Sequence, residues 1–328
     1  NVFLNKRYRI DIMTLNISLL GTGRIAEYGY IPAINKIDDV SIISVLSRSE
    51  AKGSEFAIKH SIPKAYVEID DLLEDNLLDA VIVCTPDSLH EDQVIKSCRA
   101  RKHILCEKPM STGVKSCENM IFEIEKAGII FGMAHNNRFN AGLRYIKDAL
   151  DSNLIGQVYY ARAMLTTLQN DPSGWRALGK ESKFWAMSAT GAHMIDIFRW
   201  YFGEPTKMKK LSLSPKFKSI NDEITTLSLN FNEKIICDIT ASAILPPVNR
   251  IEIYSNDNSI IGENVFGIKT DERIYHNDEK VMIEPISSFF GEVVDFTNAI
   301  IKGVEPRSTY KDGIENIRIM TDALSNGN

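Results

Sequence analysis

Ile17-Ser-Leu-Leu-Gly-Thr-Gly-Arg-Ile-Ala26 is the stretch of sequence that decides the fold of the first half of the chain. Residues 17–20 favour a buried strand, and the strand leads directly into a Gly-x-Gly-x-x-Ala loop that opens a helix. Glycines let the chain turn sharply and let backbone N–H groups approach a pyrophosphate, while the helix N-terminus adds partial positive charge. The pattern predicts a dinucleotide-binding loop formed by Gly21, Thr22, Gly23, Arg24 and Ile25.

Short apolar runs alternate with helical segments on either side of this loop. Strands rich in apolar residues and without polar alternation are typical of a parallel sheet covered on both faces. We expect strands at 17–20, 40–46, 80–84, 103–106 and 129–133, with helices at 24–36, 50–60, 88–100 and 113–126. This order predicts an α/β Rossmann domain with a doubly wound parallel sheet over residues 1–134. Met13 suggests that residues 1–12 are an extension outside the fold.

The pattern changes after about residue 140. Residues 223–231 alternate apolar and polar side chains, 235–240 and 250–254 do much the same, and 157–167 is rich in β-formers. Alternation indicates a sheet with one packed and one polar face, usually antiparallel. With helices expected at 192–202, 287–302 and 311–324, residues 135–328 should form an α+β domain with a large, mostly antiparallel, open-faced sheet. The helices from about 287 to 328 should pack back on the first domain.

Composition excludes several other classes of protein. The 328 residues have an ordinary apolar fraction of 44% and a net charge of −5, and no apolar run is long enough to span a membrane. The basic residues are scattered, so nucleic acid is not an expected partner. Five cysteines without a C-x-x-C pair indicate reduced thiols in a cytoplasmic protein, and no secretory signal is recognisable at the N-terminus. The six histidines show no metal-ligand spacing, so no metal is expected.

The residues after the second expected strand bear on the choice of cofactor. NAD-selective folds usually carry an acidic residue here, which bonds the ribose 2′-hydroxyl. This chain has Ser47 and Arg48 instead, which can donate hydrogen bonds and one fixed charge to a 2′-phosphate. We therefore favour NADP(H) over NAD(H); the alternative is a solvated turn that happens to contain an arginine.

Three further segments, together with the glycine loop, resemble the Gfo/Idh/MocA oxidoreductase family, which includes glucose–fructose oxidoreductase and inositol dehydrogenase. They are Cys84-Thr-Pro-Asp-Ser-Leu-His90, Glu107-Lys-Pro109 and Gly191-Ala-His-Met-Ile-Asp-Ile-Phe-Arg-Trp200. The segment that begins at Tyr310 also resembles the family's final helix, so the resemblance covers nearly the whole chain. It implies catalytic roles for Lys108 and His193. Asp196, three residues after His193 and so on the same helix face, is the third catalytic candidate: either Asp196 or another group orients His193, or the site works with Lys108 and His193 alone. Family members often carry an Asp four residues before this histidine, and this chain has Ala189 there.

The same segments supply further candidates for the site. Thr85, Pro86, His90, Glu107 and Lys108 lie where the fourth and fifth strands end and are expected beside the cofactor, although His90 could instead pack or cap a helix. Weaker candidates for substrate contact are Asn137 and Arg138, at the domain junction, and Trp175 and Arg176, which could stack on a sugar and bind an acidic group.

The resemblance implies transfer of a hydride between the nicotinamide and a secondary alcohol or ketone of a sugar, polyol or related small molecule. Lys108 would polarise the substrate oxygen and His193 would act as general acid or base. It also implies a homodimer or homotetramer formed through the sheet of the second domain. Two alternatives stay open: a glycoside hydrolase that uses tightly held NAD, and a non-catalytic NADP-sensing regulator. The substrate and the direction of the reaction are not predicted.

Overall fold

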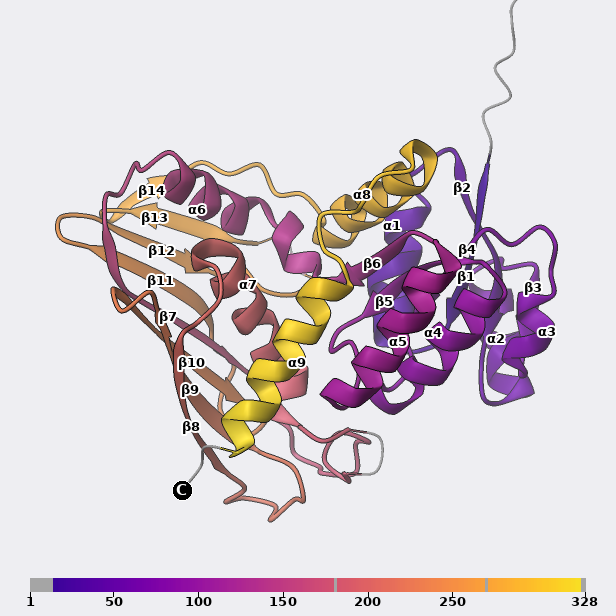
Figure 1. Cartoon of the computed structure of the whole chain (residues 1–328), viewed down its shortest axis with the longest axis horizontal. Coiled ribbons are helices and arrows are strands. Elements are labelled where there is room, and N and C mark those ends of the chain that lie inside the picture. Colours follow the sequence, from indigo (N-terminus) through magenta and orange to yellow (C-terminus); the bar gives the residue numbers. More distant parts are fainter. Residues whose placement is uncertain (1–13, 180–181, 269–270, 326–328) are drawn as a thin grey trace, which may run out of the picture.

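The computed structural model describes residues 14–179, 182–268 and 271–325, so the extension predicted at residues 1–12 lies outside the described residues. Two sheets lie side by side, each with its own helices (Figure 1). Among the described residues, no helix combines the length and the apolar character that a membrane span requires.

The first sheet has six parallel strands in the order β3-β2-β1-β4-β5-β6, which is the strand order of dinucleotide-binding folds. The strands are β1 (Leu15–Leu20), β2 (Val40–Leu46), β3 (Lys64–Tyr66), β4 (Ala80–Val83), β5 (His103–Glu107) and β6 (Phe131–Ala134). The predicted doubly wound sheet is thus confirmed, and every residue of β4 and β6 is buried. The sequence did not predict β3, which has three residues and no buried side chain.

Helices cover both faces of this sheet (Figure 1). They are α1 (Ile31–Ile34), α2 (Glu50–Lys59), α3 (Ile69–Leu73), α4 (His90–Arg99) and α5 (Val114–Ala127). The helix predicted at 24–36 contains a π-helical turn, η1 (Ala26–Tyr30), just before α1. A short 3₁₀ turn, η2 (Asp87–Leu89), precedes α4, so this helix begins slightly later than predicted.

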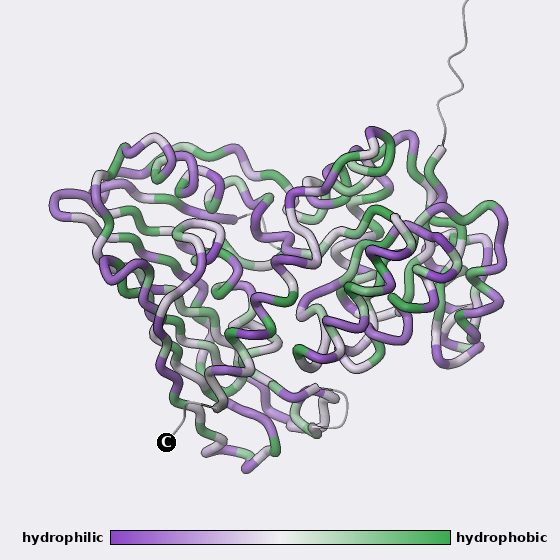
Figure 2. The backbone as a smooth tube through the Cα atoms, viewed as in Figure 1, coloured by the Kyte–Doolittle hydropathy of each residue, from purple (hydrophilic) through white to green (hydrophobic). Residues whose placement is uncertain are grey.

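The second sheet has eight strands in the order β14-β13-β12-β11-β7-β10-β9-β8. They are β7 (Val158–Thr166), β8 (Lys207–Leu213), β9 (Ile224–Phe231), β10 (Ile235–Ser242), β11 (Asn249–Ser255), β12 (Ser259–Glu263), β13 (Arg273–His276) and β14 (Glu279–Val281). Only β7 and β10 pair in parallel, so the predicted mostly antiparallel sheet is confirmed. Hydropathy alternates along these strands (Figure 2). In β9 the residues Thr225, Leu227, Leu229 and Phe231 are buried, as their spacing predicted.

One face of the second sheet is covered by helices α6 (Ala141–Asp151) and α7 (Ala192–Phe202), which contact β12, β7 and β10. The short turns η3 (Asn136–Phe139) and η4 (Met187–Gly191) precede these two helices. The opposite face carries a polar layer that includes a bidentate ion pair from Arg162 to Glu252.

The last two helices return from the second sheet toward the first domain (Figure 1). Helix α8 (Ser288–Lys302) packs on α1 and η1, where Phe289 meets the ring of Tyr30 edge-on at 5.2 Å. Helix α9 (Tyr310–Ser325) packs against α5 and β6 on one side and against α7 and β8 on the other. Through these contacts the two last helices join the first domain to the second.

Candidate active site

The glycine loop lies between β1 and η1, at the carboxyl end of the first strand. Gly21 has φ +122°, and a Cβ there would lie 2.9 Å from the carbonyl oxygen of Cys84, so this position requires glycine. A Cβ on Gly23, in contrast, would meet no atom within 4 Å. The backbone beside the start of the helix is therefore open to a ligand, and this cradle fits the pyrophosphate of a dinucleotide.

Ser47 and Arg48 follow β2, next to the glycine loop in the sheet. Ser47 is buried, and its N–H donates to the carbonyl of Tyr66 at 2.9 Å. Arg48 is exposed, and its guanidinium makes no hydrogen bond or ion pair with the described residues. A free guanidinium at this point of a dinucleotide-binding fold is available to a negatively charged group on the ribose.

His90 joins the two loops that follow β4 and β5. Its ring nitrogens lie 3.0 Å from the carbonyl oxygens of Pro109 and Thr85, and the residue is fully buried. The Lys108–Pro109 peptide bond is cis. Since the imidazole is enclosed by these loops, its placement supports a role in holding Thr85 and Pro109 and not a direct contact with a ligand.

Lys108 extends from the end of β5 toward the second domain. Its Nζ donates to the carbonyl oxygens of Ser188 and Ala189, each at 3.1 Å. Burial, aided by the positive charge of Arg176, lowers the pKa of Lys108 to about 8, against the opposing effect of nearby carboxylates. The amine is therefore able to gain and lose a proton near neutral pH.

The two carbonyl groups that hold Lys108 belong to the π-helical turn η4. Such turns occur often at functional sites. Gly191 closes the turn, where a Cβ would lie 2.2 Å from the Sδ of Met187. Ala189 has no carboxyl group, so in this chain the lysine is held by backbone oxygens of the turn.

His193 lies in the first turn of α7, directly after η4. Burial, followed by the charges of Lys108 and His135, lowers the pKa of His193 well below its ordinary value, which makes the neutral imidazole the stable form. Its side chain makes no hydrogen bond with any described residue and is only partly buried. The imidazole is therefore free to exchange a hydrogen bond with a ligand beside Lys108.

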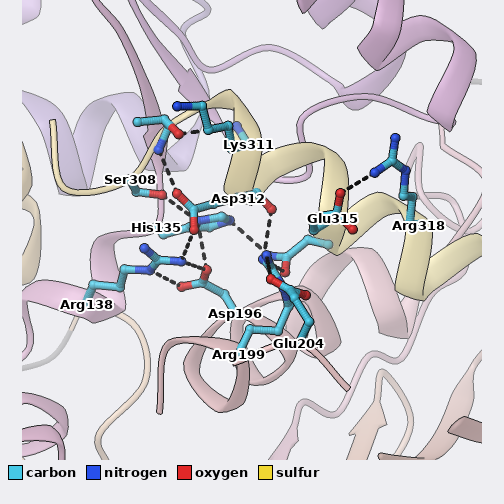
Figure 3. Close-up of polar contacts among 12 residues, drawn as sticks. His135, Arg138, Asp196, Arg199, Glu204, Ser308, Lys311, Asp312, Glu315 and Arg318 are labelled. Atoms are coloured by element: carbon cyan, nitrogen blue, oxygen red, sulfur yellow. Dashed lines mark hydrogen bonds and ion pairs between the residues drawn. The ribbon is translucent and has the colours of Figure 1, made fainter. Parts of the chain in front are cut away.

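Asp196 lies one turn after His193 but belongs to a different set of contacts (Figure 3). Its carboxylate accepts hydrogen bonds from Nε and Nη2 of Arg138, at 2.9 and 2.6 Å, and lies 3.0 Å from Nδ1 of His135. Burial alone would raise the pKa of Asp196, but the Arg138 charge holds it well below its ordinary value. Arg138 also contacts Asp312 of α9. Thus Asp196 and Arg138 join α7, η3 and α9.

The other weak candidates divide into two groups. Asn137 is buried, and its Oδ1 accepts from the N–H of Gly267 at 3.1 Å, which supports a structural role like that of Arg138. The guanidinium of Arg176 stacks on the ring of Trp175 at 3.9 Å and remains 29% exposed. Its Nε donates to the Oγ of Ser188 at 3.3 Å, so Arg176 joins the residues around Lys108.

Three residues in and behind this site, Asp87, Tyr30 and Glu292, were not recognised in the sequence, whereas Glu107 was expected beside the cofactor. Asp87 lies inside a quoted segment and is buried against Ser188, whose Oγ donates to its carboxylate at 2.6 Å. Behind the site, the hydroxyl of Tyr30 lies 2.9 Å from Glu107 and 3.4 Å from Glu292, both buried. One hydroxyl proton cannot serve two carboxylates, and burial raises the pKa of Glu292 well above its ordinary value. This shift favours the neutral, protonated form of Glu292.

No group of three or more His, Cys, Asp or Glu side chains in the described part of the chain is arranged to hold a metal ion. The five cysteines are all free thiols.

Comparison with known proteins identifies the class that this arrangement represents. A family model described as "Oxidoreductase family, NAD-binding Rossmann fold" matches residues 15–135, so the first half is the nucleotide-binding part of an oxidoreductase. A model of the GFO/IDH/MocA C-terminal domain matches residues 143–261. The chain therefore belongs to the Gfo/Idh/MocA oxidoreductase family, as its motifs predicted.

Individual relatives resemble the chain along most of its length. It is 26% identical over 305 residues to a 1,5-anhydro-D-fructose reductase of Ensifer adhaerens, covering 90% of this chain and 91% of the relative. It is also 26% identical over 317 residues to a myo-inositol 2-dehydrogenase of Thermotoga maritima, covering 91% and 92%. The crystal structure of an aldose-aldose oxidoreductase from Caulobacter crescentus shares the fold, with a TM-score of 0.89, 20% identity and coverage of 95% and 97%.

Proposed function

We propose that the protein transfers a hydride between NADP(H) and a secondary alcohol or ketone of a sugar, polyol or related small molecule. The observation that carries the proposal is the environment of the Lys108 amine. This amine has a pKa of about 8, lies beside a free imidazole at His193 and follows a strand two positions from the glycine loop in the sheet. The two curated relatives, named for a sugar derivative and a polyol, support the same substrate class.

The chain's own residues would handle the proton. A bound nicotinamide supplies or accepts the hydride at its C4 atom. In reduction, the Lys108 ammonium donates a hydrogen bond to the carbonyl oxygen and then its proton to the developing alkoxide; in oxidation, the neutral amine accepts that proton. His193, whose lowered pKa favours the neutral imidazole, holds the same oxygen in position through one ring nitrogen. We therefore assign the proton transfer mainly to Lys108, because its pKa is about 8, whereas the pKa of His193 is lowered well below its ordinary value.

We further propose that Asp196 acts by positioning. Its ion pair with Arg138 fixes the turn of α7 that follows His193, and with it the position of the imidazole. The preference for NADP(H) rests on Arg48, whose guanidinium is exposed and unpaired among the described residues after β2.

The uncovered face of the second sheet supports a homo-oligomer. Leu211 and Ile236 are 64% and 50% exposed and share this face with Tyr160 and Arg162. We propose that a second copy covers this face, and that the enzyme acts in the cytoplasm, where its five thiols would stay reduced. Light scattering of the purified protein tests the assembly: a dimer or tetramer is expected, and a monomer at micromolar concentration would contradict it.

The experiment that tests the function has two stages. NADPH and NADH are first titrated into the purified protein, and the preferred cofactor is then used with a panel of sugars, polyols and ketoses in both directions. We expect NADPH oxidation or NADP⁺ reduction with at least one member. Tight NADPH binding without turnover on the whole panel would overturn the proposal in favour of a sensor. Glycoside cleavage without net redox change would favour the hydrolase.

A further inference from the structure

Asp87 is a buried carboxylate that reaches from the first domain into the second. It follows the Thr85-Pro86 pair at the end of β4 and is 1% exposed. Its Oδ2 accepts a hydrogen bond from the Oγ of Ser188 at 2.6 Å and lies 2.9 Å from the Oγ of Ser182, whose single proton is shared with the carbonyl oxygen of Phe184 at 2.7 Å. Both serines belong to the segment that leads into α7. A charge-assisted hydrogen bond of this kind is short and strong, so the contact with Ser188 holds the buried carboxylate in place.

Ser188 connects this carboxylate to the reactive amine. Its side chain donates to Asp87, while its backbone carbonyl accepts from the Nζ of Lys108 at 3.1 Å. One residue thus carries both contacts, so the position of the lysine's acceptor depends on the contact between Ser188 and Asp87.

The carboxylate of Asp87 is also one of the charges that act on the Lys108 amine. Lys108 is faced by two positive or potentially positive groups, Arg176 and His193, and by two acidic ones, Glu107 and Asp87. Glu107 is turned toward Tyr30, from which it accepts a hydrogen bond at 2.9 Å. Asp87 instead lies on the side of Arg176, whose Nη2 is 3.7 Å from its Oδ1. It therefore offsets the charge of the guanidinium beside the amine, together with the more distant Glu107.

We propose that Asp87 is a positioning residue of this active site. Its contact with Ser188 fixes the position of the Lys108 amine, and its charge offsets that of Arg176. The inference rests on the proposed function for its meaning in catalysis, but its effect on Lys108 can be measured without any substrate. Asp87 belongs to the first domain and acts through Ser188 of the second domain.

The test compares Asp87→Asn with Asp92→Asn, which removes a 68% exposed acid from the nearby helix α4. Competitive acetylation of the cofactor-free protein, read by mass spectrometry of the Lys108 peptide over a pH series, reports the pKa of Lys108. Loss of a nearby negative charge disfavours the ammonium. Asp87→Asn should therefore move the midpoint of labelling down by about one pH unit, and Asp92→Asn should leave it unchanged.

Ser188→Ala separates positioning from charge, because it breaks the link but keeps both ionic groups. With a substrate from the panel, kcat should fall about tenfold in both Asp87→Asn and Ser188→Ala, while the dissociation constant of NADPH changes less than twofold. An unmoved labelling midpoint in Asp87→Asn, or a wild-type kcat in Ser188→Ala, would overturn the inference. If no compound on the panel is turned over, the proposed function fails, and the labelling series still decides whether Asp87 acts on Lys108. NADPH-dependent thermal stabilisation confirms that each variant is folded.

Discussion

The carboxylate of Asp196 and the guanidinium of Arg138 form a bidentate ion pair, with N–O distances of 2.9 and 2.6 Å, inside the junction between α7, η3 and α9. Both side chains are at most 5% exposed. The pair lies one helical turn from His193 and so fixes the helix that carries this imidazole. Figure 3 shows that Asp312 and His135 complete the set of contacts.

Replacing Asp196 by Asn should therefore destabilise the protein more than it alters the chemistry. Removing one partner of a buried pair leaves an uncompensated charge, which costs about 3–5 kcal/mol of the free energy of unfolding. Urea denaturation measures the loss, with the exposed Asp92→Asn as a control expected to change little. A fully stable Asp196→Asn protein that has lost turnover would instead assign Asp196 a direct role in catalysis.

The activity should depend on pH through Lys108. Because its pKa is lowered to about 8, the ammonium that reduction requires is lost above that pH, and the neutral amine that oxidation requires accumulates there. We expect kcat for carbonyl reduction to fall above about pH 8 and kcat for alcohol oxidation to rise over the same range. Parallel or flat profiles in the two directions between pH 7 and 9 would be inconsistent with this assignment.

Replacing Arg48 by Ala should weaken NADPH binding selectively. A hydrogen bond to a charged group contributes about 1.5–3 kcal/mol, which corresponds to a roughly 10- to 100-fold rise in the dissociation constant of NADPH. The dissociation constant of NADH should change little. Arg99→Ala, which removes a 66% exposed arginine of the same domain, is the matched control. Equal losses for both cofactors in Arg48→Ala would show that Arg48 does not read the 2′-phosphate.

Glu292→Gln should stabilise the protein in a pH-dependent way. The pKa of Glu292 in the fold is raised well above its ordinary value of 4.5, so the folded state holds a proton that the unfolded state releases as pH rises. The resulting penalty is absent at low pH and grows above about pH 4.5, by at most about 1.4 kcal/mol per pH unit. Gln carries no such penalty.

Urea denaturation at pH 5 and pH 8 measures this difference, with the exposed Glu305→Gln as control. The variant should gain free energy of unfolding relative to wild type mainly at pH 8. The same gain at both pH values would show that Glu292 is ionised in the folded protein.

Much of the fold was predictable, because apolar strands, the glycine loop and period-2 alternation are local signals. Strand β3 escaped prediction since it is short, and its residues Lys64 and Ala65 are exposed, so no burial pattern marks it. The π-helical turns were likewise not visible, because their residues have ordinary helical spacing.

The candidate site could be proposed from the sequence only where a recognisable motif contains its residues. Lys108 and His193 stand in recognisable segments, whereas the partners of Asp196 depend on a contact between residues 58 positions apart in the chain. Asp87 stands in a recognisable segment too, yet its role depends on Ser182 and Ser188, about 100 residues away. Helical spacing alone placed Asp196 beside His193 but could not show that Arg138 holds it.

The most direct test of the account is Lys108→Met with the substrate and cofactor found on the panel. Lys115→Met, which removes an 82% exposed lysine from the following helix, is the control. The account predicts that kcat falls by about 10²–10⁴ in Lys108→Met while the dissociation constant of NADPH and the melting temperature stay near wild type. Turnover within a few-fold of wild type, with the cofactor bound normally, would contradict it.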